Sequence, residues 1–73
     1  MAERVRIEIG FDGGQIMGAI VEPDTVDSLE AALGSGQEGA FVLEVEDGRY
    51  TVALRRIVYV KRFARDPRVG FGA

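Results

Sequence analysis

Alternating apolar and polar residues near the start of the chain predict a strand and a hairpin. Residues 4–11 read RVRIEIGF, and alternate positions are apolar. The residues expected on the buried face are Val5, Ile7, Ile9 and Phe11. Residues 12–14 (Asp-Gly-Gly) are typical of a tight turn, because glycine adopts the positive φ angles that such turns need. Residues 15–22 then form the returning strand. Both of its faces are mostly apolar, so we expect either cover on both sides or a partner against one side.

The hydrophobic period changes from two to that of a helix over residues 23–34 (PDTVDSLEAALG). The apolar stripe consists of Val26, Leu29, Ala32 and Leu33. We expect Asp24 or Asp27 to cap the N-terminus. Glu30 follows Asp27 by three residues, as in a capping box. Gly34 is expected to end the helix in the left-handed conformation.

Two further strands and a turn follow the helix. Residues 40–46 alternate with Phe41, Leu43 and Val45 inward, and Asp47-Gly48 is a strong hairpin signal before residues 49–54. The returning strand is expected to bury Tyr50, Val52 and Leu54.

A bend is expected after this hairpin. If the strand continued straight, Arg56 would share the buried face with Leu54, and burying an unpaired arginine is costly. We therefore predict a bend or bulge near residues 53–56, followed by a fifth strand. The order β-β-α-β-β-β predicts an α+β two-layer sandwich, with one helix on an antiparallel sheet of about five strands. Residues 1–66 form the single domain, and residues 67–73 form a C-terminal tail.

The composition argues against catalysis. The 73 residues include no cysteine and no histidine, which removes disulfides, thiolate zinc sites and the commonest general base. Ser28 and Ser35 have no evident activating base, since Lys61 is the single lysine. Glu44 and Glu46 alternate as on a solvated strand face and do not make a metal site with Asp47. We expect no enzyme, no cofactor and no bound metal.

One glycine pattern invites a nucleotide-binding interpretation. Residues 34–39 (GSGQEG) fit the dinucleotide fingerprint G-x-G-x-x-G. That fingerprint requires a strand before it and a helix N-terminus after it, where backbone amides face the pyrophosphate. Here it follows a helix and precedes a strand, so it lies at the negative end of the helix dipole. We interpret it as a helix stop and loop.

Charge is unevenly distributed along the chain. The net charge is −3, but basic residues concentrate after residue 50 and acidic residues before it. Two interpretations remain open. The basic strand can pair with acidic neighbours in its own sheet or in a second copy, or it can bind nucleic acid.

The candidate binding residues lie in the basic segment and the tail. Tyr59 and Phe63 are suited to stacking on bases of single-stranded nucleic acid, and a core position is the alternative for Tyr59. The segment RVGFGA offers Phe71 as an anchor for a protein partner or a sheet edge, and is otherwise a frayed end. The candidates are Arg55, Arg56, Tyr59, Lys61, Arg62, Phe63, Arg65, Arg68 and Phe71.

Several of these segments carry a resemblance to a known family. VRIEIG, an acid-rich helix start, a hairpin ending in RRIVYV, a polar linker and the closing RVGFG resemble a family of small actinobacterial proteins of uncharacterised function. The resemblance implies a β-β-α-β-β-β pattern with a Val-Gly-Phe-Gly tail, and it brings no catalytic residues. The chain departs from that pattern at GFDGG, at GSGQEG and in the basic VKRFAR.

Together these patterns predict a small non-enzymatic interaction module. We expect a homo-oligomer, with a dimer as the first expectation, and nucleic-acid binding as the alternative. The start MAERVRIEIG has no apolar signal core, and no apolar run is long enough for a membrane span, so we expect a cytoplasmic protein without membrane contact.

Overall fold

The computed structural model describes residues 4–46 and 48–64 of the chain. It confirms the α+β class and the order β-β-α-β-β-β. A 3₁₀ turn, η1, follows the fourth strand. The expected boundary at residue 66 and the tail lie outside the described residues. The elements are β1 (Val5–Phe11), β2 (Ile16–Val21), α1 (Pro23–Gly34), β3 (Ala40–Val45), β4 (Gly48–Ala53), η1 (Leu54–Arg56) and β5 (Ile57–Arg62).

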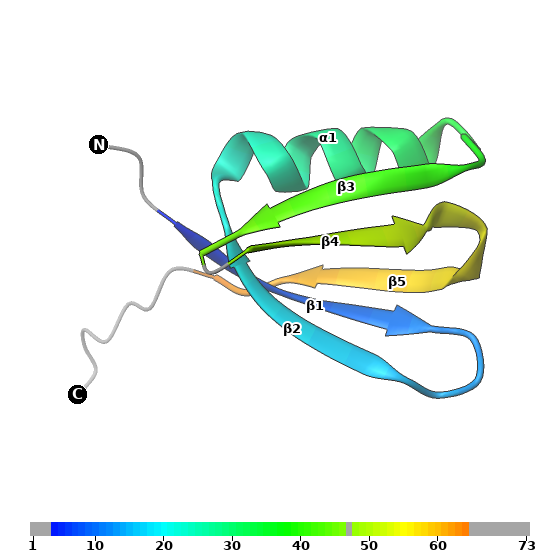
Figure 1. Cartoon of the computed structure of the whole chain (residues 1–73), viewed down its shortest axis with the longest axis horizontal. Helices are drawn as coiled ribbons and strands as arrows, with labels where there is room; N and C mark the ends of the chain where they lie inside the picture. Colours follow the sequence, from blue (N-terminus) through cyan, green and yellow to red (C-terminus); the bar gives the residue numbers. More distant parts are fainter. Residues whose placement is uncertain (1–3, 47, 65–73) are drawn as a thin grey trace.

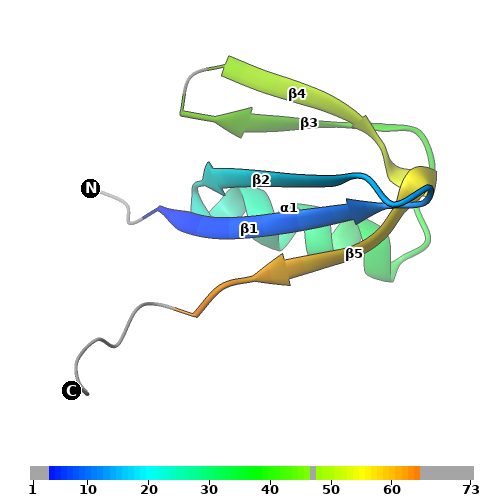
Figure 2. The ribbon, with the colours of Figure 1, turned by 90° about the horizontal axis from the view of Figure 1, so that it is seen from below.

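The five strands divide between two antiparallel sheets, whereas the sequence pattern predicted one sheet of about five strands. One sheet has the order β2-β1-β5, and β3 pairs with β4 in a separate hairpin. Figure 1 shows α1 running along one side of the strands. Figure 2 shows α1 behind β1 and β2, against one face of the three-stranded sheet, and the β3–β4 hairpin beside β2. In the described part of the chain, no helix or strand covers the opposite face of that sheet (Figure 2).

The alternation of β1 directs its apolar residues into the core, as predicted. Ile7 and Ile9 are fully buried, and Val5 and Phe11 pack against them. The β2 residues that pair with Val5, Ile7 and Ile9 also point toward the core: Val21, Ala19 and Met17. The other apolar face of β2 points away from the helix and is exposed at Ile16 and Ile20.

The start of α1 differs from the expected cap. Pro23 is the first helical residue, and Glu22 holds the cap position without a side-chain hydrogen bond. Proline suits the first position because its missing N–H would have no partner there. The capping predicted for Asp24 or Asp27, with Glu30 completing a box, is therefore wrong. The proline moves the start of the helix upstream of both aspartates.

The end of α1 also lies beyond the predicted residue. Gly34 is still helical, and Gly36 takes the left-handed conformation with φ of 74°. The Gln37 N–H donates to the Ala32 carbonyl at 3.0 Å, and the Gly36 N–H donates to the Leu33 carbonyl at 3.1 Å. These two bonds form a Schellman motif, which satisfies carbonyls left open at the helix end. The segment GSGQEG is a helix stop and loop, as predicted.

The core lies between α1, the inner face of the three-stranded sheet and the β3–β4 hairpin. Leu33, predicted in the helical stripe, is only partly buried. η1 keeps Leu54 buried while Arg55 and Arg56 remain exposed, which confirms the predicted bend. The buried residues are Ile7, Ile9, Val21, Val26, Leu29, Ala32, Leu43, Val52 and Leu54.

Tyr50 departs from the inward position predicted for it. Val52 and Leu54 are buried, but Tyr50 is 46% exposed. The hairpin is not part of the β2-β1-β5 ladder. The end of the hairpin near its turn lies beside β2, and Tyr50 borders an open groove between them. No helix of the described chain is long and apolar enough to cross a membrane.

Candidate binding surface

The side of the three-stranded sheet that faces away from α1 is open (Figure 2). Each strand contributes alternate residues to it, and the strand register places them in rows across the sheet. We call these residues the outer face: Arg6, Glu8, Gly10, Ile16, Gly18, Ile20, Tyr59 and Lys61.

The β2 edge of the outer face is apolar. Ile16 is 64% exposed and Ile20 is 43% exposed, with Gly18 between them. The sequence left open whether this second apolar face of β2 is covered, and within the described residues it is not. Neighbouring exposed apolar side chains on one flat surface are a common mark of an interaction site.

Tyr59 lies across the centre of the outer face, directly over Gly10. A Cβ atom built on Gly10 would come within 2.0 Å of the Tyr59 ring, so only glycine leaves room for this packing. The Tyr59 hydroxyl donates a 2.6 Å hydrogen bond to the Glu8 carboxylate. This bond favours the neutral phenol and raises the pKa of Tyr59 above its usual value. Tyr59 is therefore a surface residue and not a core residue.

A cluster of cations and one aromatic ring lies at the end of the outer face where β5 stops. The Arg6 guanidinium carbon lies 4.7 Å from the Phe63 ring centroid, and the Lys61 ammonium nitrogen lies 4.5 Å from it. The Phe63 N–H donates to the Arg6 carbonyl, which fixes Phe63 beside β1. Both contacts lie within the range of cation–π attraction. The Phe63 ring is thus already engaged by two cations of its own chain.

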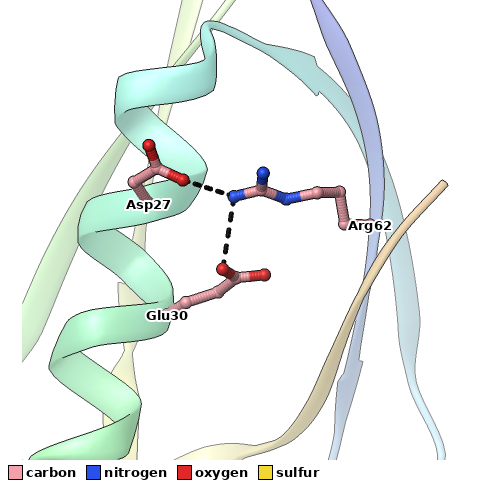
Figure 3. A network of polar contacts seen from close by, with 3 residues as sticks. All are labelled: Asp27, Glu30 and Arg62. Carbon is pink, nitrogen blue, oxygen red and sulfur yellow. Dashed lines mark hydrogen bonds and ion pairs between the residues drawn. The ribbon is translucent and has the colours of Figure 1, made fainter. Parts of the chain in front are cut away.

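Arg62 points to the opposite side of the sheet, toward α1 (Figure 3). It lies opposite Ile7 in the register, and it ion-pairs with Asp27 at 2.5 Å and Glu30 at 3.2 Å. The hydrogen bond to Asp27 raises the pKa of Arg62 further above its already high value. Asp27 and Glu30, which were predicted to cap α1, therefore link the helix to β5 through Arg62.

The predicted basic segment is thus divided among three places. Tyr59 and Lys61 lie on the outer face with Phe63 at its end, Arg62 faces the helix, and Arg55 and Arg56 lie on η1. Arg56 ion-pairs with Asp12 at 3.4 Å, across to the β1–β2 turn. Basic side chains therefore do pair with acidic neighbours of the same chain.

The β2 residues and Arg6 were not among the predicted site residues. The signal for them was present, because the strand at residues 15–22 is apolar on both faces. What periodicity could not show was which of those faces α1 covers. Arg65, Arg68 and Phe71, which were predicted as binding residues, lie outside the described residues.

A groove of about 490 Å³ with both polar and apolar lining lies between β2 and the β3–β4 hairpin. Its apolar lining comes from Ile20, Val45 and Tyr50, with Arg6 and Glu46 at its border. β2 is the edge strand of its sheet on this side, so the groove runs along an unbonded strand edge.

A smaller pocket beside the groove shares Ile20, Val45 and Glu46 with it, and we call this pocket the acidic mouth. Glu22, Glu44 and Glu46 line this mouth together with Arg4. Arg4 ion-pairs with Glu22 at 3.2 Å and with Glu46 at 3.3 Å. Three carboxylates around one guanidinium leave an excess of negative charge. Within residues 4–46 and 48–64, no three carboxylates, these included, are arranged so that they could hold a metal ion.

Comparison with protein-family models, with curated proteins and with solved structures finds no match to this chain. The resemblance to the small actinobacterial proteins therefore stays a prediction.

Proposed function

We propose that this chain is a small non-enzymatic interaction module that forms a homodimer through the outer face of its three-stranded sheet. The observation that carries the proposal is the open apolar edge of that face, where Ile16 is 64% and Ile20 is 43% exposed. A second copy covers this edge at its Ile16 end.

The outer face is suited to pairing with itself. It holds charges of both signs next to apolar residues, since Glu8 lies opposite Lys61 in the register. A twofold interface uses the same patch on both copies, so a patch with both signs can meet its own complement. A surface of one sign would repel its copy.

The size of the chain supports the same proposal. A domain of about this length buries only about 60% of the surface that its unfolded chain exposes, so its stability is small. Association with a second copy stabilises the folded state by mass action. Burying Ile16 therefore benefits both the fold and the interface.

Light scattering on the purified protein over a range of concentrations tests the dimer. We expect a dimer for the unchanged chain and a monomer for Ile16→Lys. The matched control is Val42→Lys, which places the same charge at an exposed strand residue on the β3–β4 hairpin and keeps the dimer. A monomeric unchanged chain at high micromolar concentration overturns the proposal. A dimer that survives Ile16→Lys shows that another surface is used.

Added salt gives a second readout. Arg56 and Arg62 are already paired within the chain. The proposed interface is mainly apolar, and screening by salt acts chiefly on exposed charges. We expect the dimer to persist at high salt.

Binding of single-stranded nucleic acid is the alternative, because Tyr59, Lys61 and Phe63 lie together on or beside the outer face. Three features weaken it. Glu8 places a carboxylate in the centre of that face, Phe63 is engaged by two cations, and Arg62 faces the helix. We expect no change in the anisotropy of a labelled oligonucleotide at low salt. Binding that Lys61→Glu abolishes would make nucleic acid the ligand of this face.

A further inference from the structure

We propose that residues 65–73 of the same chain bind in the groove between β2 and the β3–β4 hairpin, where they add a strand to the free edge of β2. The groove shares Ile20 with the outer face, so the segment covers the Ile20 end of the β2 edge and leaves the Ile16 end to the second copy. The proposal goes beyond the proposed dimer and does not depend on it.

The groove provides the three features that a bound strand requires. β2 is an edge strand, so its backbone can pair with an added segment. Ile20, Val45 and Tyr50 provide apolar contacts along the groove. The mouth has an acidic excess from Glu22, Glu44 and Glu46 around Arg4.

The composition of residues 65–73 (RDPRVGFGA) is complementary to these features. Val69 and Phe71 alternate with Gly70 and Gly72, so an extended segment presents its apolar side chains on one side. The glycines leave the other side of the segment without side chains. Arginines at 65 and 68 match the acidic mouth.

The segment also begins at the right place. The Phe63 N–H bonds to Arg6 near the start of β1, and Val5 pairs with Val21 at the end of β2. The last described residue of β5 therefore lies at the same end of the sheet as the acidic mouth. A strand added beside β2 lies three strand spacings from β5, about 14 Å. Nine extended residues span up to about 30 Å, which is more than enough.

Attachment to the same chain favours this occupant over a free peptide. Tethering converts binding into an intramolecular event, with an effective concentration in the millimolar range for a short linker. A weak strand addition can therefore be well populated without a separate partner.

Paramagnetic relaxation tests the proposal on the full chain. The chain has no cysteine, so Ala73→Cys accepts a single nitroxide label. We expect loss of the amide signals of Ile20, Val45 and Tyr50, with those of α1 retained. Phe71→Ala in the labelled chain should restore the lost signals. The matched control Asp66→Ala, upstream of the alternating residues, should leave them broadened.

Two outcomes overturn the proposal. Broadening that is spread over the surface, or that is unchanged by Phe71→Ala, shows that the segment does not bind in the groove. The second outcome comes from mixing labelled chains with isotope-enriched unlabelled chains. Broadening that persists in this mixture assigns the contact to a second copy. Neither outcome bears on the Ile16→Lys light-scattering result, so the two proposals fail separately.

Discussion

Two glycines at the end of α1 should respond to alanine in opposite directions. Gly34 is helical and has open space where a Cβ would stand, whereas Gly36 has φ of 74°. Alanine in place of a helical glycine stabilises by about 0.5–1 kcal/mol, because glycine loses more conformational freedom on folding. Alanine in the left-handed conformation costs about 1–2 kcal/mol.

The two variants should therefore differ by about 1.5–3 kcal/mol in the free energy of unfolding. For a domain of this size, 1 kcal/mol shifts the Tm by about 4–8 °C. Thermal and urea unfolding followed by circular dichroism should place Gly34→Ala above the unchanged chain and Gly36→Ala below it. Gly36→Asn is the matched control and should lie between glycine and alanine, because asparagine tolerates this conformation better.

The reverse order would refute the reasoning. If Gly34→Ala destabilises and Gly36→Ala has no effect, the helix ends at Gly34 and the Schellman motif at Gly36 does not form. Equal effects of both substitutions would mean that neither glycine is required by its backbone conformation.

Three further predictions concern the outer face and the core. Gly10→Ala should lower the Tm because its Cβ displaces the Tyr59 ring, and the same change in a Tyr59→Ala background should not lower it. In a Tyr50→Phe variant, where Tyr59 is the one remaining tyrosine, the tyrosinate absorbance should appear above the usual pKa of 10.0, and Glu8→Gln should lower that pKa. Because the pKa of Tyr59 is raised in the folded state, the hydrogen bond of its neutral phenol to Glu8 stabilises the fold below pH 10. This stabilisation is lost as the pH rises through the raised pKa, and unfolding measured over a range of pH would show the loss. Leu43→Ala should destabilise by about 2–5 kcal/mol in urea unfolding, because Leu43 is fully buried.

The extents of the helix and the strands follow from local sequence patterns. The change of hydrophobic period predicts a helix over residues 23–34, and the structure has α1 at Pro23–Gly34. The argument that Arg56 cannot be buried predicts a break before the last strand, where η1 lies. These predictions succeed because periodicity and the cost of burying charge depend on residues near each other in the chain.

The caps of the helix are less predictable, although they are local too. Asp27 and Glu30 have the spacing of a capping box, and Gly34 is a plausible helix end. A proline at the first position and a second glycine two residues after Gly34 are competing signals of the same kind. Local patterns did not decide between them, and the observed helix uses Pro23 and Gly36.

The partners of the charged residues depend on the tertiary structure. Arg62 and Asp27 are 35 residues apart in the chain. They meet because β5 pairs with β1 in the sheet that α1 covers, and Arg62 points from β5 toward that helix. Charge composition suggested that basic and acidic segments pair. It could not distinguish Arg62, which faces the helix, from Lys61, its neighbour on the outer face.

The sequence alone determined the order of elements, the buried face of β1 and the absence of cysteine and histidine side chains. The tertiary structure decided which side of β2 is open and where the groove lies. Both depend on the placement of the β3–β4 hairpin beside β2 as a separate sheet, and not as a continuation of the β2-β1-β5 ladder. That placement results from packing between residues far apart in the chain, which hydrophobic period and turn signals do not specify.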